Sequence, residues 1–141
     1  MQLNSYLTFN GNCEAAFRFY EQTLGGKLTM LLAHKDAPTA EHVPAEWHDK
    51  IMHARLELGT QRLMGSDQPP QHSAALQGFS VQLELTDAGE AERIFHALAI
   101  NGEVTMPFGP TFWAHRFGML KDQFGVPWMI NCEHAASHIN R

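Results

Sequence analysis

PTFWAHRFGMLKDQFGVPWMINC, residues 110–132, contains two apolar runs on either side of the turn-prone residues DQFG at 122–125. Asp and Gly supply the backbone angles that a tight hairpin turn requires. Pro127 has no N–H group to donate, so it fits the start of a strand or the edge of a sheet. The stretch therefore predicts a β-hairpin. We expect its first strand to carry Trp113 and His115 on one face, as the wall of a core or of a pocket.

The hairpin follows a strand, a helix and a second strand. Residues 79–85 alternate apolar and polar side chains, Asp87 can cap a helix with an apolar stripe, and residues 103–108 predict a further strand. The same order occurs earlier in the chain. There, strands are predicted at 3–9, 27–34, 52–58 and 61–65, with a helix from the N-cap Asn12 to Leu24 and an irregular loop at 35–50.

The two halves of the sequence form an internal repeat. An offset of 76 residues pairs Leu7 with Leu83 and Phe9 with Leu85, while an offset of 65 pairs Met64 with Met129. Each half must bury the apolar face of its sheet under its own helix. The sequence therefore predicts an α+β fold of two tandem βαβββ modules forming a curved sheet around a cleft. The expected boundaries are residues 1–65 for the first module, 66–78 for a linker, 79–133 for the second module and 134–141 for a C-terminal tail.

Composition narrows the possible functions. The chain has 141 residues and a formal net charge of −5, which argues against a nucleic-acid-binding protein because phosphate contacts need clustered Lys and Arg. No apolar run is long enough to span a membrane, and the first residues lack the pattern of a signal peptide. Two cysteines are too few for a disulfide framework. We therefore expect a cytoplasmic protein that binds neither nucleic acid nor membrane.

Three motifs together resemble a known superfamily. They are GNCEAAFRFYEQTLGG at 11–26, MGSD at 64–67 and DQFGVPW at 122–128, within two βαβββ units. The combination is similar to the vicinal oxygen chelate (glyoxalase/bleomycin resistance/dioxygenase) superfamily, and within it to the PhnB-like branch. Members of this branch are sometimes labelled as demethylubiquinone methyltransferase-like. The chain, however, has no glycine-rich strand-to-helix loop or parallel-sheet pattern that would support a methyltransferase.

The resemblance implies a place for a divalent metal, because enzymes of this superfamily hold one with His and Glu at strand ends facing the cleft. Strand alternation puts Asn4, Met64, Ser80 and Met129 at those four places. A register shift of one residue in either direction brings no His, Cys, Asp or Glu. Because a divalent ion needs several such ligands within about 2.0–2.6 Å, we expect no metal and no cofactor.

The same alternation predicts which side chains line the cleft. The expected ligand-binding residues are Tyr6, His53, Arg55, Gln82, Glu84, Trp113 and His115. His53 and Arg55 would form a polar wall for an anionic or hydrogen-bonding ligand, or alternatively a solvated surface. Trp113 and His115 would stack on a flat ligand, or alternatively pack in a core or dimer contact. Glu84 would act as a general base if burial raised its pKa, or would be an ordinary surface carboxylate.

Three functions remain open from the sequence. The leading prediction is a small-molecule-binding protein of the glyoxalase/bleomycin-resistance type that has lost the metal site. The second is a lyase or isomerase that uses another arrangement, through Glu84 or His53, so enzymatic activity is left open. The third is a protein-interaction domain. A homodimer is expected, because short sheets leave unpaired edges and exposed aromatic surface.

Overall fold

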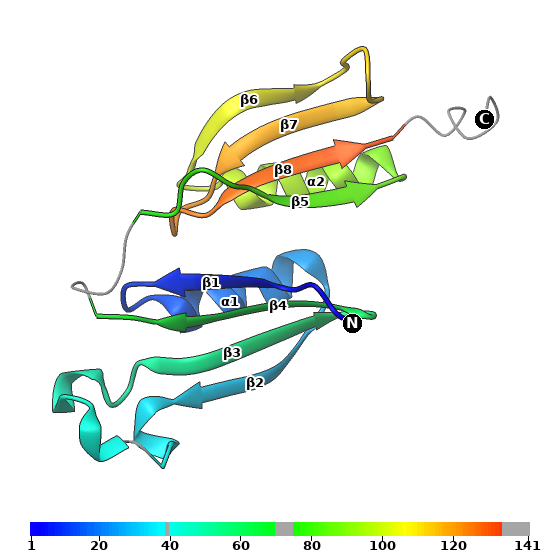
Figure 1. Ribbon diagram of the computed structural model, residues 1–141. Coiled ribbons are helices and arrows are strands. Elements are labelled where there is room, and N and C mark those ends of the chain that lie inside the picture. The colour runs from blue at the N-terminus through cyan, green and yellow to red at the C-terminus, as the bar shows by residue number, and fades with distance from the viewer. Residues whose placement is uncertain (39, 70–74, 134–141) are drawn as a thin grey trace. The chain divides into compact units, whose positions relative to one another are not determined.

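The computed structural model describes residues 1–38, 40–69 and 75–133, and the chain divides into two compact units, Met1–Ala74 and Ala75–Arg141. Within the described residues, each unit contains one four-stranded sheet and one α-helix (Figure 1). The predicted α+β fold of two βαβββ modules is confirmed. The expected tail, residues 134–141, and residues 70–74 of the expected linker lie outside the described residues.

The first unit follows the predicted order of elements. It consists of β1 (Ser5–Phe9), α1 (Cys13–Leu24), β2 (Lys27–Ala33), β3 (Ile51–Leu58) and β4 (Gln61–Asp67). The strand order is β1-β4-β3-β2, with β1 and β4 parallel and the other neighbours antiparallel. The loop between β2 and β3 contains three short 3-10 helices, η1 (His34–Asp36), η2 (Ala40–His42) and η3 (Ala45–Trp47).

The second unit repeats this topology. It consists of β5 (Val81–Leu85), α2 (Ala88–Ala99), β6 (Glu103–Gly109), β7 (Arg116–Lys121) and β8 (Pro127–Cys132), in the order β5-β8-β7-β6. The register also repeats, because Tyr6 pairs with Met64 and Gln82 pairs with Met129, as the offsets of 76 and 65 require. Even an irregularity repeats. The ladder breaks between Leu28 and Met30 in one sheet and between Val104 and Met106 in the other.

The first strand of the hairpin is shorter than the sequence indicated. β7 begins at Arg116, so Trp113 and His115 precede it and do not lie within it. The Thr111 N–H donates to the Ala114 carbonyl at 3.2 Å, and the Ala114 N–H donates to Thr111 Oγ1 at 3.0 Å. A threonine side chain that bonds the backbone in this way competes with the ladder, and Pro110 has no N–H for it. The segment therefore turns before the strand starts.

Each helix covers one face of its own sheet (Figure 1). α1 buries Phe17 and Tyr20, and the Phe17 ring meets Phe9 of β1 edge-on at a centroid distance of 6.1 Å. α2 buries Phe95, whose ring stacks on Phe108 of β6 at 5.2 Å. Burying one such side chain stabilises a fold by about 1.5–3 kcal/mol, so these faces form the two cores.

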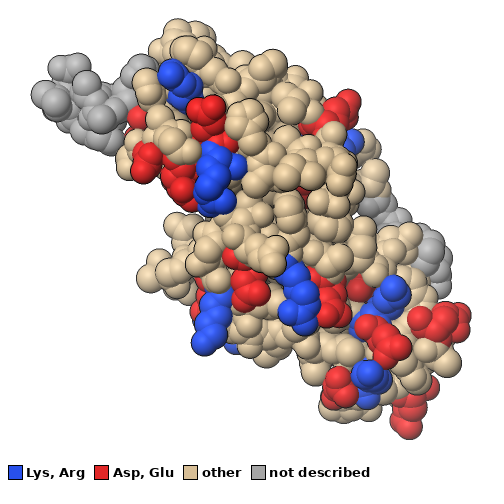
Figure 2. Space-filling view, turned by 180° about the vertical axis from the view of Figure 1, so that it is seen from behind, with Lys and Arg blue, Asp and Glu red and all other residues tan. Residues whose placement is uncertain are grey.

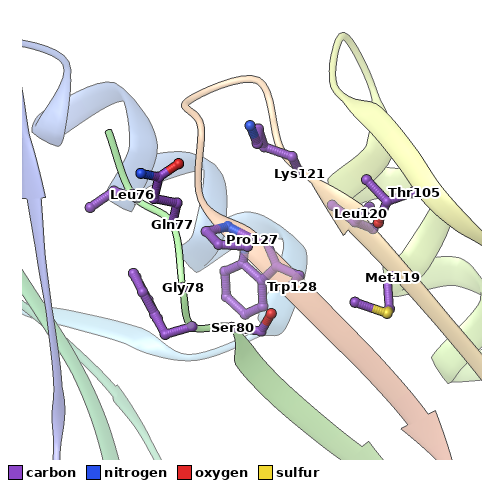
Figure 3. Close-up of a pocket in the computed structure, with 11 residues that line it drawn as sticks. Leu76, Gln77, Gly78, Ser80, Thr105, Met119, Leu120, Lys121, Pro127 and Trp128 are labelled. Atoms are coloured by element: carbon purple, nitrogen blue, oxygen red, sulfur yellow. The ribbon is translucent and has the colours of Figure 1, made fainter. Parts of the chain in front are cut away.

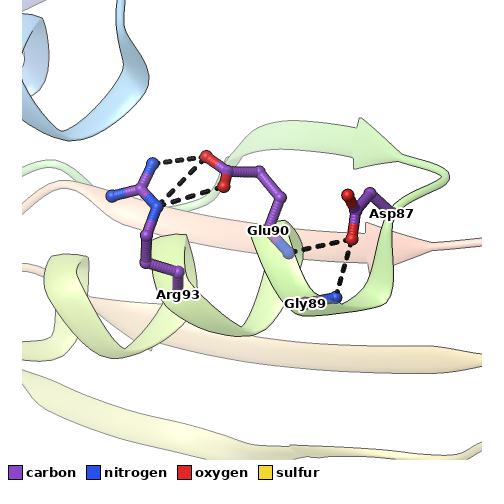
Figure 4. A network of polar contacts seen from close by, with 4 residues as sticks. All are labelled: Asp87, Gly89, Glu90 and Arg93. Atoms are coloured by element: carbon purple, nitrogen blue, oxygen red, sulfur yellow. Dashed lines mark hydrogen bonds and ion pairs between the residues drawn. The ribbon is translucent and has the colours of Figure 1, made fainter.

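The two helices are capped by different means. Asp87 caps α2 as predicted, since its Oδ1 accepts the Gly89 and Glu90 N–H groups at 2.9 and 3.2 Å (Figure 4). Asn12 occupies the N-cap position of α1, but its side chain makes no capping bond. The first N–H of α1, from Cys13, is instead donated to Asp67 Oδ1 at 3.0 Å. The expected local cap is thus replaced by a carboxylate from the end of β4.

Candidate functional site

Three of the expected residues share one face of the first sheet. In β1 and β3, Leu7, Ala54 and Leu56 are buried on the face that packs under α1. Strand alternation puts Tyr6, His53 and Arg55 on the opposite face. There Tyr6 lies beside Met64, and Met64 lies beside Arg55, in one row across β1, β4 and β3. We call this surface the face opposite α1.

Tyr6 and His53 form a direct contact across β4. The Tyr6 hydroxyl lies 3.0 Å from His53 Nδ1, and the two rings stack at 5.7 Å with an interplanar angle of 26°. Partial burial, together with the nearby Arg55 guanidinium, holds the pKa of His53 below its ordinary value. A neutral imidazole can accept the phenol proton at Nδ1, so the pair presents a polarised hydroxyl and a ring face.

Arg55 belongs to a charged cluster on the same face. Its Nε donates to Thr29 Oγ1 at 3.1 Å and lies 3.9 Å from Glu57, while Arg62 lies 3.6 Å from the other Glu57 oxygen. The Thr29 hydrogen bond and these two guanidinium groups lower the pKa of Glu57. The cluster has two guanidinium groups, Arg55 and Arg62, and one carboxylate, Glu57, so its net charge is positive although the whole protein has a net charge of −5. The cluster therefore favours an anionic ligand group.

Gln82 and Glu84 lie on the corresponding face of the second sheet, opposite α2. Gln82 is beside Met129, and Glu84 is beside Asn131 of β8. The Asn131 amide donates to Glu84 Oε1 at 3.4 Å, a long contact. A hydrogen bond and charge repulsion with Glu133 raise the pKa of the Glu84 carboxyl. A raised pKa brings a carboxyl group closer to the range in which general acid–base catalysis is efficient.

The amide oxygen of Asn131 is a second notable feature of this face. It is buried and has no hydrogen-bond partner among the described residues. Glu84, which pairs with Asn131, lines a small pocket of about 140 Å³ with Leu85, Thr86 and Glu133. Buried acceptors are normally satisfied, so this oxygen is suited to accept a hydrogen bond from a ligand or an ordered water. Asn131 lies two residues after Met129 on β8, so strand alternation puts both on this face, but no sequence signal indicated Glu133.

Trp113 and His115 lie in the loop before β7. The Trp113 ring is 51% exposed and packs edge-on against Phe117 at 5.4 Å, while Phe112 is 95% exposed. Phe117 pairs with Asn131, so it lies on the face opposite α2. The structure therefore brings Trp113 to that face from a loop and not from a strand. Within the second unit, Trp113, Gln82 and Glu84 all belong to this side of the sheet.

The residues at the implied metal positions do not fit a divalent ion. Met64 lies between Tyr6 and Arg55, and Met129 lies beside Gln82, which offers thioether, phenol and amide groups. A hard or borderline divalent ion prefers carboxylate and imidazole ligands. Within residues 1–38, 40–69 and 75–133, no group of three or more His, Cys, Asp or Glu could hold a metal.

Two βαβββ modules, each with one helix on one face of its sheet, define the class of fold to which this chain belongs. The model of the Glyoxalase/Bleomycin resistance protein/Dioxygenase superfamily matches residues 2–130, and the chain belongs to this superfamily.

The relatives include Protein YjdN of Escherichia coli (strain K12), which is 39% identical over 139 residues and covers 93% of this chain and 95% of its own. The crystal structure of protein PA1353 from Pseudomonas aeruginosa is 51% identical, with a TM-score of 0.87 over 94% of this chain and 98% of its own. A Bacillus cereus structure described as a putative 3-demethylubiquinone-9 3-methyltransferase, PhnB protein, is 24% identical, with a TM-score of 0.79 over 94% and 99%. It resembles this chain in fold, so the similarity to PhnB-like proteins is confirmed at that level.

Proposed function

We propose that this chain is a small-molecule-binding protein that holds its ligand through side chains of the sheet faces and not through a metal. Members of the superfamily bind small molecules. The observation that carries the proposal is the row Tyr6–Met64–Arg55, in which a thioether occupies an implied metal position between a phenol and a guanidinium. The ligand-binding residues remain those predicted, and the shared cleft between the modules remains a prediction.

The chemistry of the two faces indicates a flat ligand with an anionic or hydrogen-bonding group. Arg55 and the Tyr6–His53 pair supply charge-assisted and neutral hydrogen bonds, and Trp113 supplies an exposed ring. On the surface in view in Figure 2, basic and acidic side chains are interspersed, without the broad basic area that a nucleic acid needs. No helix within the described residues is long and apolar enough to cross a membrane.

A ligand screen tests this proposal. A panel of aromatic carboxylates and phosphonates is added to the protein in buffer containing EDTA, and the melting temperature is recorded. At least one compound should raise it, and Arg55→Ala and Trp113→Ala should weaken that compound's binding with little change in the melting temperature of the free protein. Arg18→Ala and Ile100→Ala are the matched controls, because both side chains are exposed and lie outside the proposed residues. Failure of every compound, or binding only without EDTA, would contradict the proposal.

A second candidate function is proton-transfer catalysis, and the Glu84–Glu133 pair is the observation that favours it. The neighbouring Glu133 raises the pKa of Glu84, and the Asn131 amide contacts Glu84 Oε1 at 3.4 Å. If this candidate is right, a compound that binds should also be converted, and Glu84→Gln should abolish conversion while binding persists. Conversion that survives Glu84→Gln would exclude Glu84 from the reaction.

A further inference from the structure

A groove crosses the second sheet at the end where β7 turns into β8. It has a volume of about 280 Å³, and four strands or their extensions contribute to it. Pro127 pairs with Lys121, Ser80 precedes β5, and Thr105 lies at the irregularity of β6. Figure 3 shows Pro127 and Trp128 between Ser80 on one side and Thr105 and Met119 on the other. None of the ligand-binding residues expected from the sequence lines this groove.

The walls of the groove are mostly apolar and include groups suited to a flat ring. Phe79 is 44% exposed, and the Met119 thioether and the Pro127 ring lie on the face opposite α2. The thioether of Met119 can make a favourable contact with an aromatic ligand, and the Phe79 ring can stack on the same ligand. A groove of this size is close to the lower end of the volumes that hold small ligands.

The floor of the groove is held in place by a buried hydrogen-bond network. Trp128 is 1% exposed, and its indole N–H donates to Asp122 Oδ2 at 2.9 Å. Asp122 Oδ1 accepts the N–H groups of Phe124 and Val126 at 2.9 and 3.0 Å. Because this network is complete without a ligand, the floor needs little rearrangement when one binds.

The amine of Lys121 places a positive charge at this groove. Among its described lining residues, Lys121 is the one that carries a charge. Lys121 forms no ion pair with any described carboxylate, including Glu103, its neighbour on β6. Asp122, next to it in sequence, uses both carboxylate oxygens in the turn. Lys121 has no ion-pair partner among the described residues and lies beside apolar walls. Such a site is complementary to a ligand that carries both a negative charge and an apolar ring.

We propose that this groove binds small aromatic anions, such as an aryl carboxylate, with the ring against Phe79, Met119 and Pro127 and the carboxylate at Lys121 Nζ. All the described lining residues belong to the second unit, and they include neither Trp113 nor a residue of the Tyr6–His53–Arg55 cluster; Ser80 is one of the four positions that the resemblance implies for a metal. The proposal goes beyond the function proposed above because it names a ligand class and a residue, Lys121, that this function does not use. The neutral hydroxyl groups of Ser80 and Thr105 are available as further donors at the walls.

The test uses 2-naphthoate and protein carrying 13C-methyl methionine, followed by NMR. Saturable shifts of the Met119 methyl signal, assigned with Met119→Leu, give both the location and the dissociation constant. Lys121→Gln should weaken binding by about fivefold or more, because it removes the charge-assisted contact. Lys27→Gln, the same change on an exposed lysine of the first unit, should leave it unchanged. The neutral analogue 2-naphthalenemethanol should bind wild-type protein more weakly than 2-naphthoate.

Three results would overturn the proposal. They are the absence of a saturable Met119 shift, equal binding of the acid and the alcohol, and equal binding by the wild type and Lys121→Gln. Weakening by Arg55→Ala without weakening by Lys121→Gln would place the anion at the first sheet, which contradicts the groove and supports the function proposed above. Thermal melts of each variant confirm that it is folded, and Phe79→Ala supplies a second variant at the groove if Lys121→Gln melts early.

Discussion

At the scale of single residues, two buried carboxylates organise the chain. Asp67 is 1% exposed and accepts three backbone N–H groups, from Gly11, Cys13 and Ile51, at 2.9–3.0 Å. It therefore fixes the start of α1 and the start of β3 from the end of β4. Asp122 has the corresponding role within the second hairpin. The turn position of Asp122 was predictable from the sequence because its partners are local. The role of Asp67 was not, because its partners are 16–56 residues away.

Replacing Asp67 should be among the most damaging single changes in the first unit. Asp67→Ala leaves three backbone donors unsatisfied, and we expect the free energy of unfolding to fall by about 3–5 kcal/mol. The measurement is urea unfolding monitored by circular dichroism. Asp49→Ala removes an exposed carboxylate paired with Lys35 and should leave the free energy of unfolding nearly unchanged, because solvent screens such a pair. Equal effects of the two changes would show that the Asp67 bonds do not hold the unit together.

The titration of His53 reports on the Tyr6–His53–Arg55 cluster. Its pKa should lie below 6.5, the usual value, and Arg55→Ala should raise it because one neighbouring positive charge is removed. A histidine whose pKa is depressed on folding stabilises the fold above its unfolded pKa. That contribution is lost as the pH falls through its folded pKa. NMR titration of the imidazole signals measures the shift, with Arg18→Ala as a control that leaves it unchanged. A His53 pKa at or above 6.5 would mean that the cluster is not arranged as described.

At the scale of elements, the alternation of apolar and polar residues was the most useful sequence pattern for predicting which side chains share a face of the sheet. It assigned Tyr6, His53 and Arg55 to one face and Leu7, Ala54 and Leu56 to the other, because the alternation of apolar and polar side chains is regular there. It failed at residues 111–115, where a turn bonded through the Thr111 side chain replaces the strand. The groove at Lys121 could not be predicted from the sequence either, because it forms where residues of four strands or their extensions come together.

Glycines allow the helices to pack closely on the sheets. A Cβ atom on Gly118 of β7 would lie 2.6 Å from the Phe95 ring and 2.9 Å from the Phe108 backbone. Gly118→Ala should therefore lower the free energy of unfolding by about 1–3 kcal/mol. Gly109→Ala is the matched control in the neighbouring strand, since a Cβ atom there meets nothing within 4 Å. Thermal melts of the two variants would refute this account if Gly118→Ala were as stable as Gly109→Ala.

At the scale of the whole molecule, the chain is one module used twice with different side chains on the face opposite the helix. The equivalent rows are Tyr6–Met64–Arg55 and Gln82–Met129–Met119. The first row is polar and basic in part, and the second contains two thioethers. The repeat was predictable from the offsets, because both halves must bury the same apolar pattern. The identity of the ligand was not predictable, because the fold does not constrain which side chains occupy these exposed faces.

A homodimer remains a prediction for the whole molecule. Within the described residues, β1 and β2 are the edge strands of the first sheet and β5 and β6 those of the second, and Phe112 and Trp113 are both exposed. Such surface favours association in a two-fold dimer. Multi-angle light scattering at micromolar concentration should give about twice the chain mass of 15.8 kDa. The monomer mass under these conditions would contradict the prediction.

The central claim is that side chains, and not a metal, hold the ligand. Its most direct test is calorimetric titration of one compound identified in the ligand screen, carried out on a single preparation in three states. The protein is used as purified, after dialysis against EDTA, and after addition of one equivalent of Zn²⁺, Ni²⁺ or Mn²⁺. We expect the same dissociation constant in all three states, because no metal ion takes part in binding. Loss of binding after EDTA, restored by a metal ion, would contradict the claim.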